Sequence, residues 1–450
     1  MRNGLLGSIA ALAAGAGLAF AQSPAPPAGF PAGQPGTAVA QSGVFEPVPA
    51  GPSALGTMGP VEPIGLMAGT DAYAGEHGER PLSLEHVNVQ GDYLLAYMRP
   101  FLPSYPLVSV GTTGPRGALN GPGTTVLING PFDFNAVSGG RYTIDVWADR
   151  DRRFGAEFSA FVLAPQALVT TYGFGDQIVA RPVINADTGL PVSLLVAAPG
   201  LATGGVEVDA TNRLWGYEAN GKFRLWADAT KEITVLTGFR YIDLSEQLNI
   251  NQATRILPAP PVITQFFYGI PFANPFEIDV RDSFRTRNQG YFHQVGIQGK
   301  VRIGRWSAMW AAKFNYGVNH ETLVINGNST LFPTLASFNA GQGNTVPGGL
   351  LALPSNIGRQ HADPFTVMPE GTFQIGYRFT RCVDAVMGYQ FLYLSRAIRP
   401  GDQINATVGP TQIPTSAFFG LPGGNLSPPP GIKQSDFWMQ AVNFGVNIHY

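Results

Sequence analysis

The last sixteen residues, Ser435 to Tyr450, alternate strictly between two kinds of side chain and end on an aromatic residue. One face of this segment carries the apolar set Val442, Phe444, Val446, Ile448 and Tyr450. A period of two predicts a β-strand with one apolar face. Because a terminal aromatic on such a strand is typical of bacterial outer-membrane barrels, we expect this strand to be the one that the barrel-assembly machinery recognises.

Residues 1–21 have the pattern of an export signal. Arg2 gives a short basic start, Leu5 to Phe20 is a run of small and apolar residues, and Ala19-Phe20-Ala21 fits a cleavage site. No later segment approaches the roughly 18 consecutive apolar residues of a membrane-spanning helix. We therefore expect a cleaved signal peptide and a bacterial outer-membrane location without such a helix.

The composition favours a shielded, β-rich protein. Charged residues make up 13% of the chain, about half of the roughly 25% that is usual in soluble domains. Gly and Pro are abundant, with 56 and 38 residues, and helical periodicity is scarce. A net charge of -2 and the lack of basic clusters with interleaved aromatics argue against nucleic acid as a partner.

Residues 22–81 are rich in Pro, Gly and Ala and have few residues that could build a core. This composition predicts a disordered leader, and we favour an export linker over a cell-wall tether. The remaining residues, 82–450, are expected to form one domain.

Ten alternating segments follow the leader, joined by connections that are alternately long and very short. They are approximately Val87 to Met98, Arg141 to Asp149, Arg153 to Leu163, Asn212 to Asp228, Lys231 to Gln247, Thr286 to Gly304, Trp306 to Ile325, Thr366 to Arg381, Val383 to Ala397 and Ser435 to Tyr450. This pattern predicts an all-β, antiparallel, up-and-down transmembrane barrel of about ten strands, with twelve as an alternative. An even count puts both termini on the side of the short turns, which would be the periplasm.

If the apolar face of each strand meets lipid, the charged side chains point into the lumen. The predicted lumen charges are Asp92, Asp145, Glu157, Lys222, Arg224, Arg240, Lys300, Arg302, Lys313 and Arg378. They could form a structural network in a narrow barrel, or a transverse field that acts on a permeating solute of unknown identity. We favour the network, because about eight strands already leave an interior that side chains can fill.

No motif for a catalytic, metal or cofactor site is found, and no cofactor is expected. The chain lacks HExxH, GxSxG and a phosphate-binding loop, and its six histidines do not share metal-ligand spacing. The single cysteine, Cys382, excludes a disulfide framework. His320 and Glu321 at the end of the seventh segment leave a rim-located outer-membrane enzyme as a minor alternative. Because only one such pair is present, we expect a protein that is not an enzyme.

Several blocks resemble a known bacterial outer-membrane family. These are Met387 to Asn405 (MGYQFLYLSRAIRPGDQIN), Gly238 to Glu246 (GFRYIDLSE), Pro369-Glu370 and Ser435 to Trp438 (SDFW). They resemble the Putative beta barrel porin-7 family over roughly Val87 to Tyr450. The resemblance implies an outer-membrane barrel and supplies no catalytic residues.

The sequence therefore predicts an outer-membrane barrel that contacts lipid and is either a porin or a surface-exposed structural barrel with long outer loops. A secreted or cell-surface soluble β-rich structural protein is the alternative. The two differ in whether the aromatic face stays exposed, since a soluble fold must bury that face against a second layer.

Overall fold

The structure is a computed structural model that describes residues 87–449, except 113–115, 129, 150, 174–176, 259–263, 274 and 334–340. The expected signal peptide at 1–21, the leader at 22–81 and Tyr450 lie outside the described residues.

Ten antiparallel strands close into a barrel in chain order. They are β1 (Val87–Met98), β4 (Ala136–Trp147), β5 (Phe154–Leu163), β9 (Ala202–Ala227), β10 (Lys231–Ile256), β13 (Phe276–Ile303), β14 (Trp306–Phe332), β17 (Phe365–Arg378), β18 (Val383–Ile398) and β20 (Gln434–His449). Each pairs with the next, and β20 pairs with β1 to complete the ring. The expected all-β, up-and-down barrel of about ten strands is confirmed.

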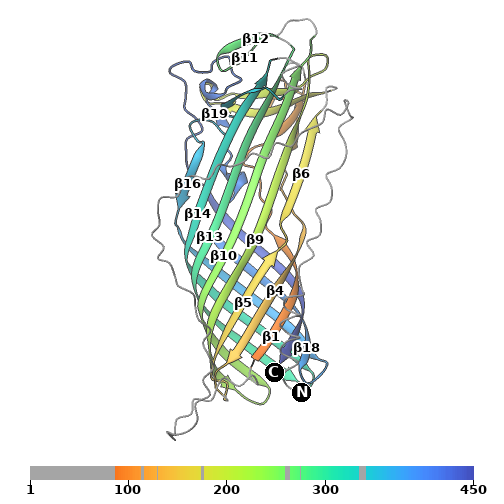
Figure 1. The fold of residues 1–450 in the computed structure, drawn as a ribbon, viewed down its shortest axis with the longest axis vertical. Coiled ribbons are helices and arrows are strands. Elements are labelled where there is room, and N and C mark those ends of the chain that lie inside the picture. Colours follow the sequence, from red (N-terminus) through yellow and green to blue (C-terminus); the bar gives the residue numbers. More distant parts are fainter. Residues whose placement is uncertain are drawn as a thin grey trace, which may run out of the picture. The chain divides into compact units, whose positions relative to one another are not determined.

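The two ends of the barrel differ. At one end Asn88 pairs with His449, and short turns join β4 to β5, β9 to β10, β13 to β14 and β17 to β18. The long connections all lie at the opposite end. In Figure 1, β1 and β18 are labelled near the first end, and β11 (Thr264–Phe267), β12 (Ile270–Ala273) and β19 (Thr407–Val408) near the second.

Four neighbouring strands are much longer than a membrane crossing needs. β9, β10, β13 and β14 have 26, 26, 28 and 27 residues, whereas β5 has 10. A tilted spanning strand requires about 9 to 11 residues. The expected limits at Asn212, Gln247, Thr286 and Ile325 were therefore wrong, since each strand continues for seven to ten residues beyond them. In Figure 1 these four strands rise together as one wall.

In the long strands the apolar residues move from the outward-facing to the inward-facing positions partway along the strand. In β10, odd positions such as Phe239 point outward in the lower part, and even positions such as Leu248 and Ile250 are buried in the upper part. Side chains alternate between the two faces of a strand, so this switch turns the apolar face from lipid to the interior. The upper wall therefore has a polar outside and an apolar inside.

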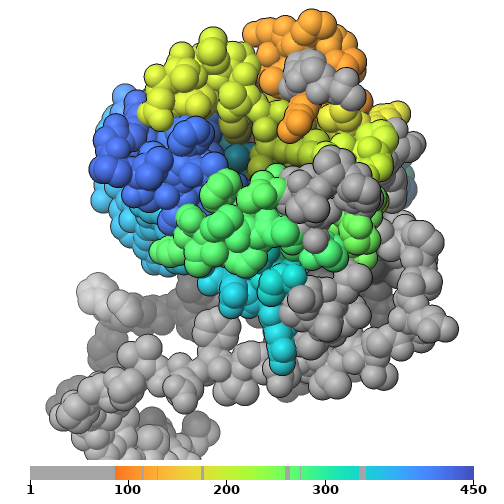
Figure 2. Space-filling view, turned by 90° about the horizontal axis from the view of Figure 1, so that it is seen from above, coloured from red at the N-terminus to blue at the C-terminus, as the bar shows by residue number. Residues whose placement is uncertain are grey.

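The long connections hold folded structure that the sequence did not predict. A small sheet comprises β2 (Val108–Gly111), β3 (Thr125–Ile128), β7 (Ile178–Asn185), β8 (Pro191–Ala197) and β19. Further strands extend the wall, namely β6 (Gln166–Gly173), β15 (Asn344–Pro347) and β16 (Gly358–Ala362). Short 3-10 helices occupy Pro400–Gln403 (η2) and Pro410–Gln412 (η3). Figure 2 shows this end from above, with orange, yellow-green, green and blue loop segments around the centre.

We call these connecting segments the cap, since they pack against the inner face of the upper wall. Their apolar core joins Phe101, Val108 and Val183 from the connections to Leu248 and Phe284 from the wall, all of which are buried. Burial of apolar side chains is the main contribution to the stability of folded loops, so this core stabilises the cap.

The outer face of the lower barrel is apolar and aromatic. Phe154, Trp306 and Phe373 are exposed by 58%, 58% and 49%. Tyr217, Tyr241 and Tyr291 form a row across β9, β10 and β13, with neighbouring ring centroids 5.3 and 5.2 Å apart. Such a row is typical of the interface between the hydrocarbon and the lipid headgroups. Among the described residues, no helix is both long and apolar enough to cross a membrane.

Candidate functional site

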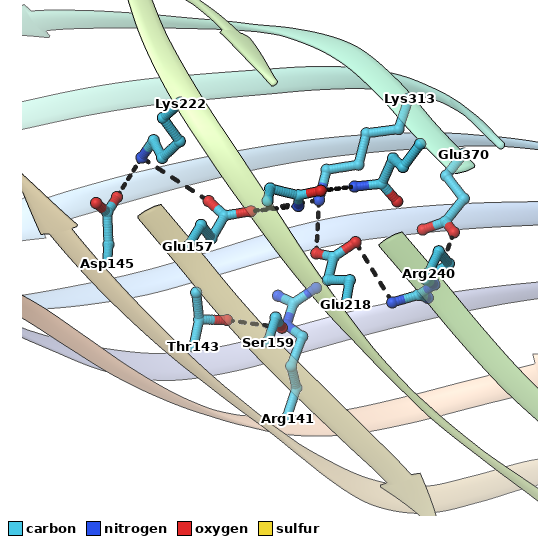
Figure 3. A network of polar contacts seen from close by, with 12 residues as sticks. Arg141, Thr143, Asp145, Glu157, Ser159, Glu218, Lys222, Arg240, Lys313 and Glu370 are labelled. Carbon is cyan, nitrogen blue, oxygen red and sulfur yellow. Dashed lines mark hydrogen bonds and ion pairs between the residues drawn. The ribbon is translucent and has the colours of Figure 1, made fainter. Parts of the chain in front are cut away.

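Inside the lower barrel, seven charged side chains of alternating sign form a continuous chain of ion pairs. In order they are Asp145, Lys222, Glu157, Lys313, Glu218, Arg240 and Glu370. They come from β4, β5, β9, β10, β14 and β17, so the chain crosses the lumen (Figure 3). We call this set the ionic chain.

Its central members are almost completely buried. Lys313 Nζ lies 2.6 Å from Glu218 Oε1 and 3.5 Å from Glu157 Oε1. Arg240 contacts Glu218 at 3.4 Å and Glu370 at 3.1 Å. Each cation therefore has two anionic partners, which offsets the desolvation of its charge.

A second ionic contact lies beside this chain. Arg141 contacts Asp92 at 2.8 Å and donates a 2.7 Å hydrogen bond to Gln390. Asn443 of β20 donates to the other oxygen of Asp92. The carboxylate therefore links β1, β4 and β20, the strands around the closing pair of the ring.

Beyond the ionic chain, an apolar layer fills the lumen. It includes buried residues from nine of the ten strands, among them Leu94, Leu214, Ile242, Phe292, Met368, Leu392 and Phe437. Gly216 and Gly290 leave room for the rings of Phe161 and Phe292, because a Cβ at these positions would lie 2.9 and 2.2 Å from ring carbons. At this level the lumen is therefore lined and occupied by buried apolar side chains that pack against one another.

Above the apolar layer, one loop arginine is inserted into the barrel. Arg399, which precedes η2, donates hydrogen bonds of 2.6 and 2.8 Å to the Glu246 carboxylate of β10. The guanidinium lies 5.6 and 5.4 Å from the ring centroids of Phe101 and Phe437. We call the Arg399–Glu246 pair the clamp, since it fixes the last long connection to the wall.

A second buried ion pair ties the cap to the upper wall. Arg181 of β7 contacts Asp282 of β13 at 2.6 Å, and both side chains are almost fully buried. The same carboxylate accepts hydrogen bonds from the backbone N–H groups of Leu350, Leu351 and Ala352. Asp282 therefore joins two cap segments to one strand.

The predicted lumen charges occupy three places. Asp145, Glu157, Lys222, Arg240 and Lys313 form most of the ionic chain, and Asp92 pairs with Arg141. The other four, Arg224, Lys300, Arg302 and Arg378, line a cavity of about 270 Å³ near the chain termini. We call this cavity the vestibule.

Sequence reasoning missed several members of these sites. Glu218 and Glu370 complete the ionic chain, and Arg141, Glu246 and Arg399 form the other pairs. Strand parity would have found Glu218, because it shares the inward face of Lys222 four residues away. No local signal marks Arg399, since its partner lies 153 residues away.

The rim pair that suggested an enzyme is not assembled. Glu321 points inward and accepts a hydrogen bond from Gln434, whereas His320 lies on the outward face with Nδ1 2.6 Å from Asp363. His361 stacks on His320 with the ring centroids 5.6 Å apart. Among the described residues, no group of three or more His, Cys, Asp or Glu side chains has the arrangement of a metal site.

A model of the family described as Putative beta barrel porin-7 matches residues 95–450. The chain belongs to this family. It is an outer-membrane β-barrel protein, which is consistent with its exposed aromatic face. No curated protein matches the chain.

Solved structures with a similar fold are distant. The outer membrane protease OmpT from Escherichia coli has 6% identity and a TM-score of 0.37, over 82% of this chain and 98% of that one. A Pseudomonas aeruginosa FadL homologue has 6% identity and a TM-score of 0.25, over 81% and 90%. The toluene transporter TodX of P. putida has 8% identity and a TM-score of 0.18, over 81% and 90%.

Two of the blocks that resemble this porin-7 family meet in space. Glu246 ends the block from Gly238, and Arg399 begins the Arg-Pro-Gly-Asp-Gln-Ile segment of the other block. The second block is fixed further by Gln403, whose side chain donates to the carbonyls of Arg399 and Lys433. The clamp therefore gives these two blocks a common structural role.

Proposed function

We propose that this protein is a non-conducting outer-membrane barrel that presents its folded cap at the cell surface. The apolar layer supports this proposal more than any other observation, because a continuous aqueous pore requires a polar route through the lumen. The ionic chain then serves as a structural network. The proposal assigns no catalytic reaction to the chain.

The proposed orientation has the termini and short turns in the periplasm and the cap outside. It is supported by the usual asymmetry of outer-membrane barrels, which have short periplasmic turns and longer extracellular loops. The upper wall agrees with this assignment, since its outward residues are polar above the tyrosine row of Tyr217, Tyr241 and Tyr291.

The conductance of the purified full-length protein in a planar bilayer tests the sealed lumen. We expect no stepwise conductance from the wild type. The triple variant Leu214→Ala, Phe161→Ala and Phe292→Ala removes three side chains of the apolar layer and should leak. A matched control changes Phe154, Phe158 and Phe223, which face outward, to Ala. Stable conductance steps from the wild type would contradict the proposal and favour a porin.

Cys382 provides a natural reporter of orientation, because it is the only cysteine and lies exposed in the short turn between β17 and β18. A membrane-impermeant maleimide should label it only after the cells are lysed. The control moves the thiol to the exposed turn between β7 and β8 in the variant Cys382→Ser with Thr188→Cys, which intact cells should label. Labelling of the wild type on intact cells would reverse the proposed orientation.

A further inference from the structure

The vestibule is strongly cationic. Among its described lining residues, eight are Lys or Arg and three are Asp or Glu, an excess of five positive charges. Its volume of about 270 Å³ far exceeds the roughly 10–15 Å³ that one water requires. The lining includes the short turns next to the termini, so the cavity opens at that end.

Its three carboxylates are already engaged. Asp145 pairs with Lys222 at the inner end of the vestibule. Glu232 lies 3.2 Å from Arg224 and accepts a hydrogen bond from Thr234. Asp228 accepts hydrogen bonds from the backbone N–H groups that follow it in its own turn. None of the three therefore neutralises the remaining cations by direct contact.

Lys300 and Arg302 are two of those remaining cations, and they are neighbours on the inner face of one strand. They lie two residues apart on β13, so both point into the vestibule. Neither side chain has a hydrogen bond or an ion pair within 4 Å to any described residue. In this lack of a partner they differ from the cations of the ionic chain, each of which has two anionic partners.

A second pair of cations is held nearby. Lys222 Nζ and Arg224 Cζ lie 4.8 and 4.7 Å from the ring centroid of Trp147. Contact with an aromatic face orients these two cations, whose charges are balanced by Asp145 and Glu232. β9 and β13 therefore contribute Lys-x-Arg pairs to the same cavity, since both strands have their inward positions two residues apart.

We propose that the vestibule binds a multivalent phosphate-class anion, either inorganic phosphate or a phosphomonoester, that enters from the end of the barrel near the termini. The guanidinium of Arg302 can bind two oxygens of a tetrahedral anion, and the ammonium of Lys300 adds a compact charge. An anion there would give both side chains the partner that the protein does not supply. This inference goes beyond the proposed function, because a closed-ended vestibule can bind an anion in a barrel that does not conduct.

Calorimetric titration of the full-length protein in detergent with inorganic phosphate and with the phosphomonoester phenyl phosphate tests this site, and the tighter of the two identifies the form of the anion that it prefers. We expect saturable binding of one anion per chain. The double variant Lys300→Gln with Arg302→Gln should bind about tenfold more weakly or worse, since a hydrogen bond to a charged group contributes at least that change in affinity. Because neither residue has a protein partner to leave unpaired, the variant should fold, and heat-modifiable migration checks this.

The matched control is Arg213→Gln with Arg285→Gln, which removes the same charge from exposed positions on the outer wall. It should bind phosphate like the wild type. The single variant Lys300→Met, which keeps an unbranched side chain, repeats the test if the double variant misfolds. Equal weakening in the vestibule and control variants, or displacement of phosphate by chloride at equal ionic strength, would show only diffuse attraction and overturn the proposal. Conductance of the wild type would contradict the sealed lumen and leave this result unaffected.

Discussion

At the scale of single residues, ion pairs inside the barrel differ in how much water reaches them. The side chain of Arg240 is 4% exposed and has two anionic partners, whereas that of Arg378 is 33% exposed and pairs with Asp384. A buried charge that loses its partner cannot be solvated, and an exposed one can. The two arginines therefore differ in their contribution to stability although both were predicted as lumen charges.

We predict that Arg240→Ala lowers the free energy of unfolding by about 3–5 kcal/mol, because Glu218 and Glu370 lose a buried partner. Arg378→Ala should cost less, about 1 kcal/mol, because Asp384 keeps its 2.7 Å contact with His449 Nε2. Urea unfolding of both variants in lipid vesicles measures the difference. Equal losses would mean that the ionic chain is hydrated.

Two aspartates in the short turns should make stability depend on pH. Backbone N–H groups of Phe154 and Arg153 donate to Asp149 and hold the pKa of its carboxyl below the ordinary value of 3.8. In the next short turn the N–H groups of Thr230 and Lys231 lower the pKa of Asp228 in the same way. A carboxyl whose pKa is lower in the folded state than in the unfolded state stabilises the folded protein at pH values above the ordinary pKa. This stabilisation is lost as the pH falls through the pKa of the folded state.

We predict that Asp149→Asn with Asp228→Asn flattens the loss of thermal stability between pH 5 and about pH 3. Thermal unfolding followed by circular dichroism at several pH values measures it. The exposed Asp187→Asn, in the cap, is the control and should leave the profile unchanged. A profile that keeps its wild-type slope in the double variant would show that other carboxyls carry the acid sensitivity.

At the scale of strands, the alternating pattern predicted the ring but not the height of its wall. In the lower part of the barrel, outward-facing apolar residues such as Phe239 and Val295 are exposed, as the alternating pattern requires of a lipid-facing strand. Above them the apolar residues stand at the inward-facing positions instead. The predicted limits therefore exclude Leu248 and Phe284, although the alternation continues through both residues. Such a change of apolar face can be recognised in a sequence, because it indicates that the two faces of a strand exchange apolar and polar surroundings while the strand continues.

The cap could not be predicted in the same way. Its strands β2, β3 and β19 have four residues or fewer, which is too short for a periodic signal. Its anchors are side chains such as Arg181 and Arg399, whose partners lie 101 and 153 residues away. The candidate site was therefore predicted as a set of inward charges, but its pairing and the apolar layer above it required the fold.

The apolar face of β20 supports the prediction that assembly depends on this strand. Phe444 is 46% exposed on the lipid side, between Tyr93 of β1 and Met387 of β18. We predict that Phe444→Lys lowers the yield in the outer membrane, since a lysine on the lipid face costs about 2–4 kcal/mol near the midplane. Thr188→Lys in the cap is the control. The fraction of heat-modifiable protein in outer-membrane preparations measures both, and equal yields would contradict the prediction.

At the scale of the whole molecule, the clamp joins the cap to the barrel. Glu246 is fully buried, so Arg399→Ala removes the only cation that contacts it among the described residues and leaves its side chain with the hydrogen bond from Asn212. We predict a loss of about 3–5 kcal/mol and faster proteolysis of the last long connection. The double variant Arg399→Met with Glu246→Leu should recover much of the stability. Limited proteolysis and urea unfolding measure both effects, and a double variant as unstable as the single one would assign the loss to packing against Phe101 and Phe437.

The pairing of β1 with β20 has a kinetic consequence. Asn88 and His449 are hydrogen-bonded partners although 361 residues separate them in the chain. The ordering entropy of such a contact is large, and rates of folding fall as contacting residues become more distant in sequence. The two edge strands must therefore wait for the whole chain before they meet. Until then each presents unpaired backbone groups that could join another chain, so the slowest step of folding is also the one most exposed to aggregation.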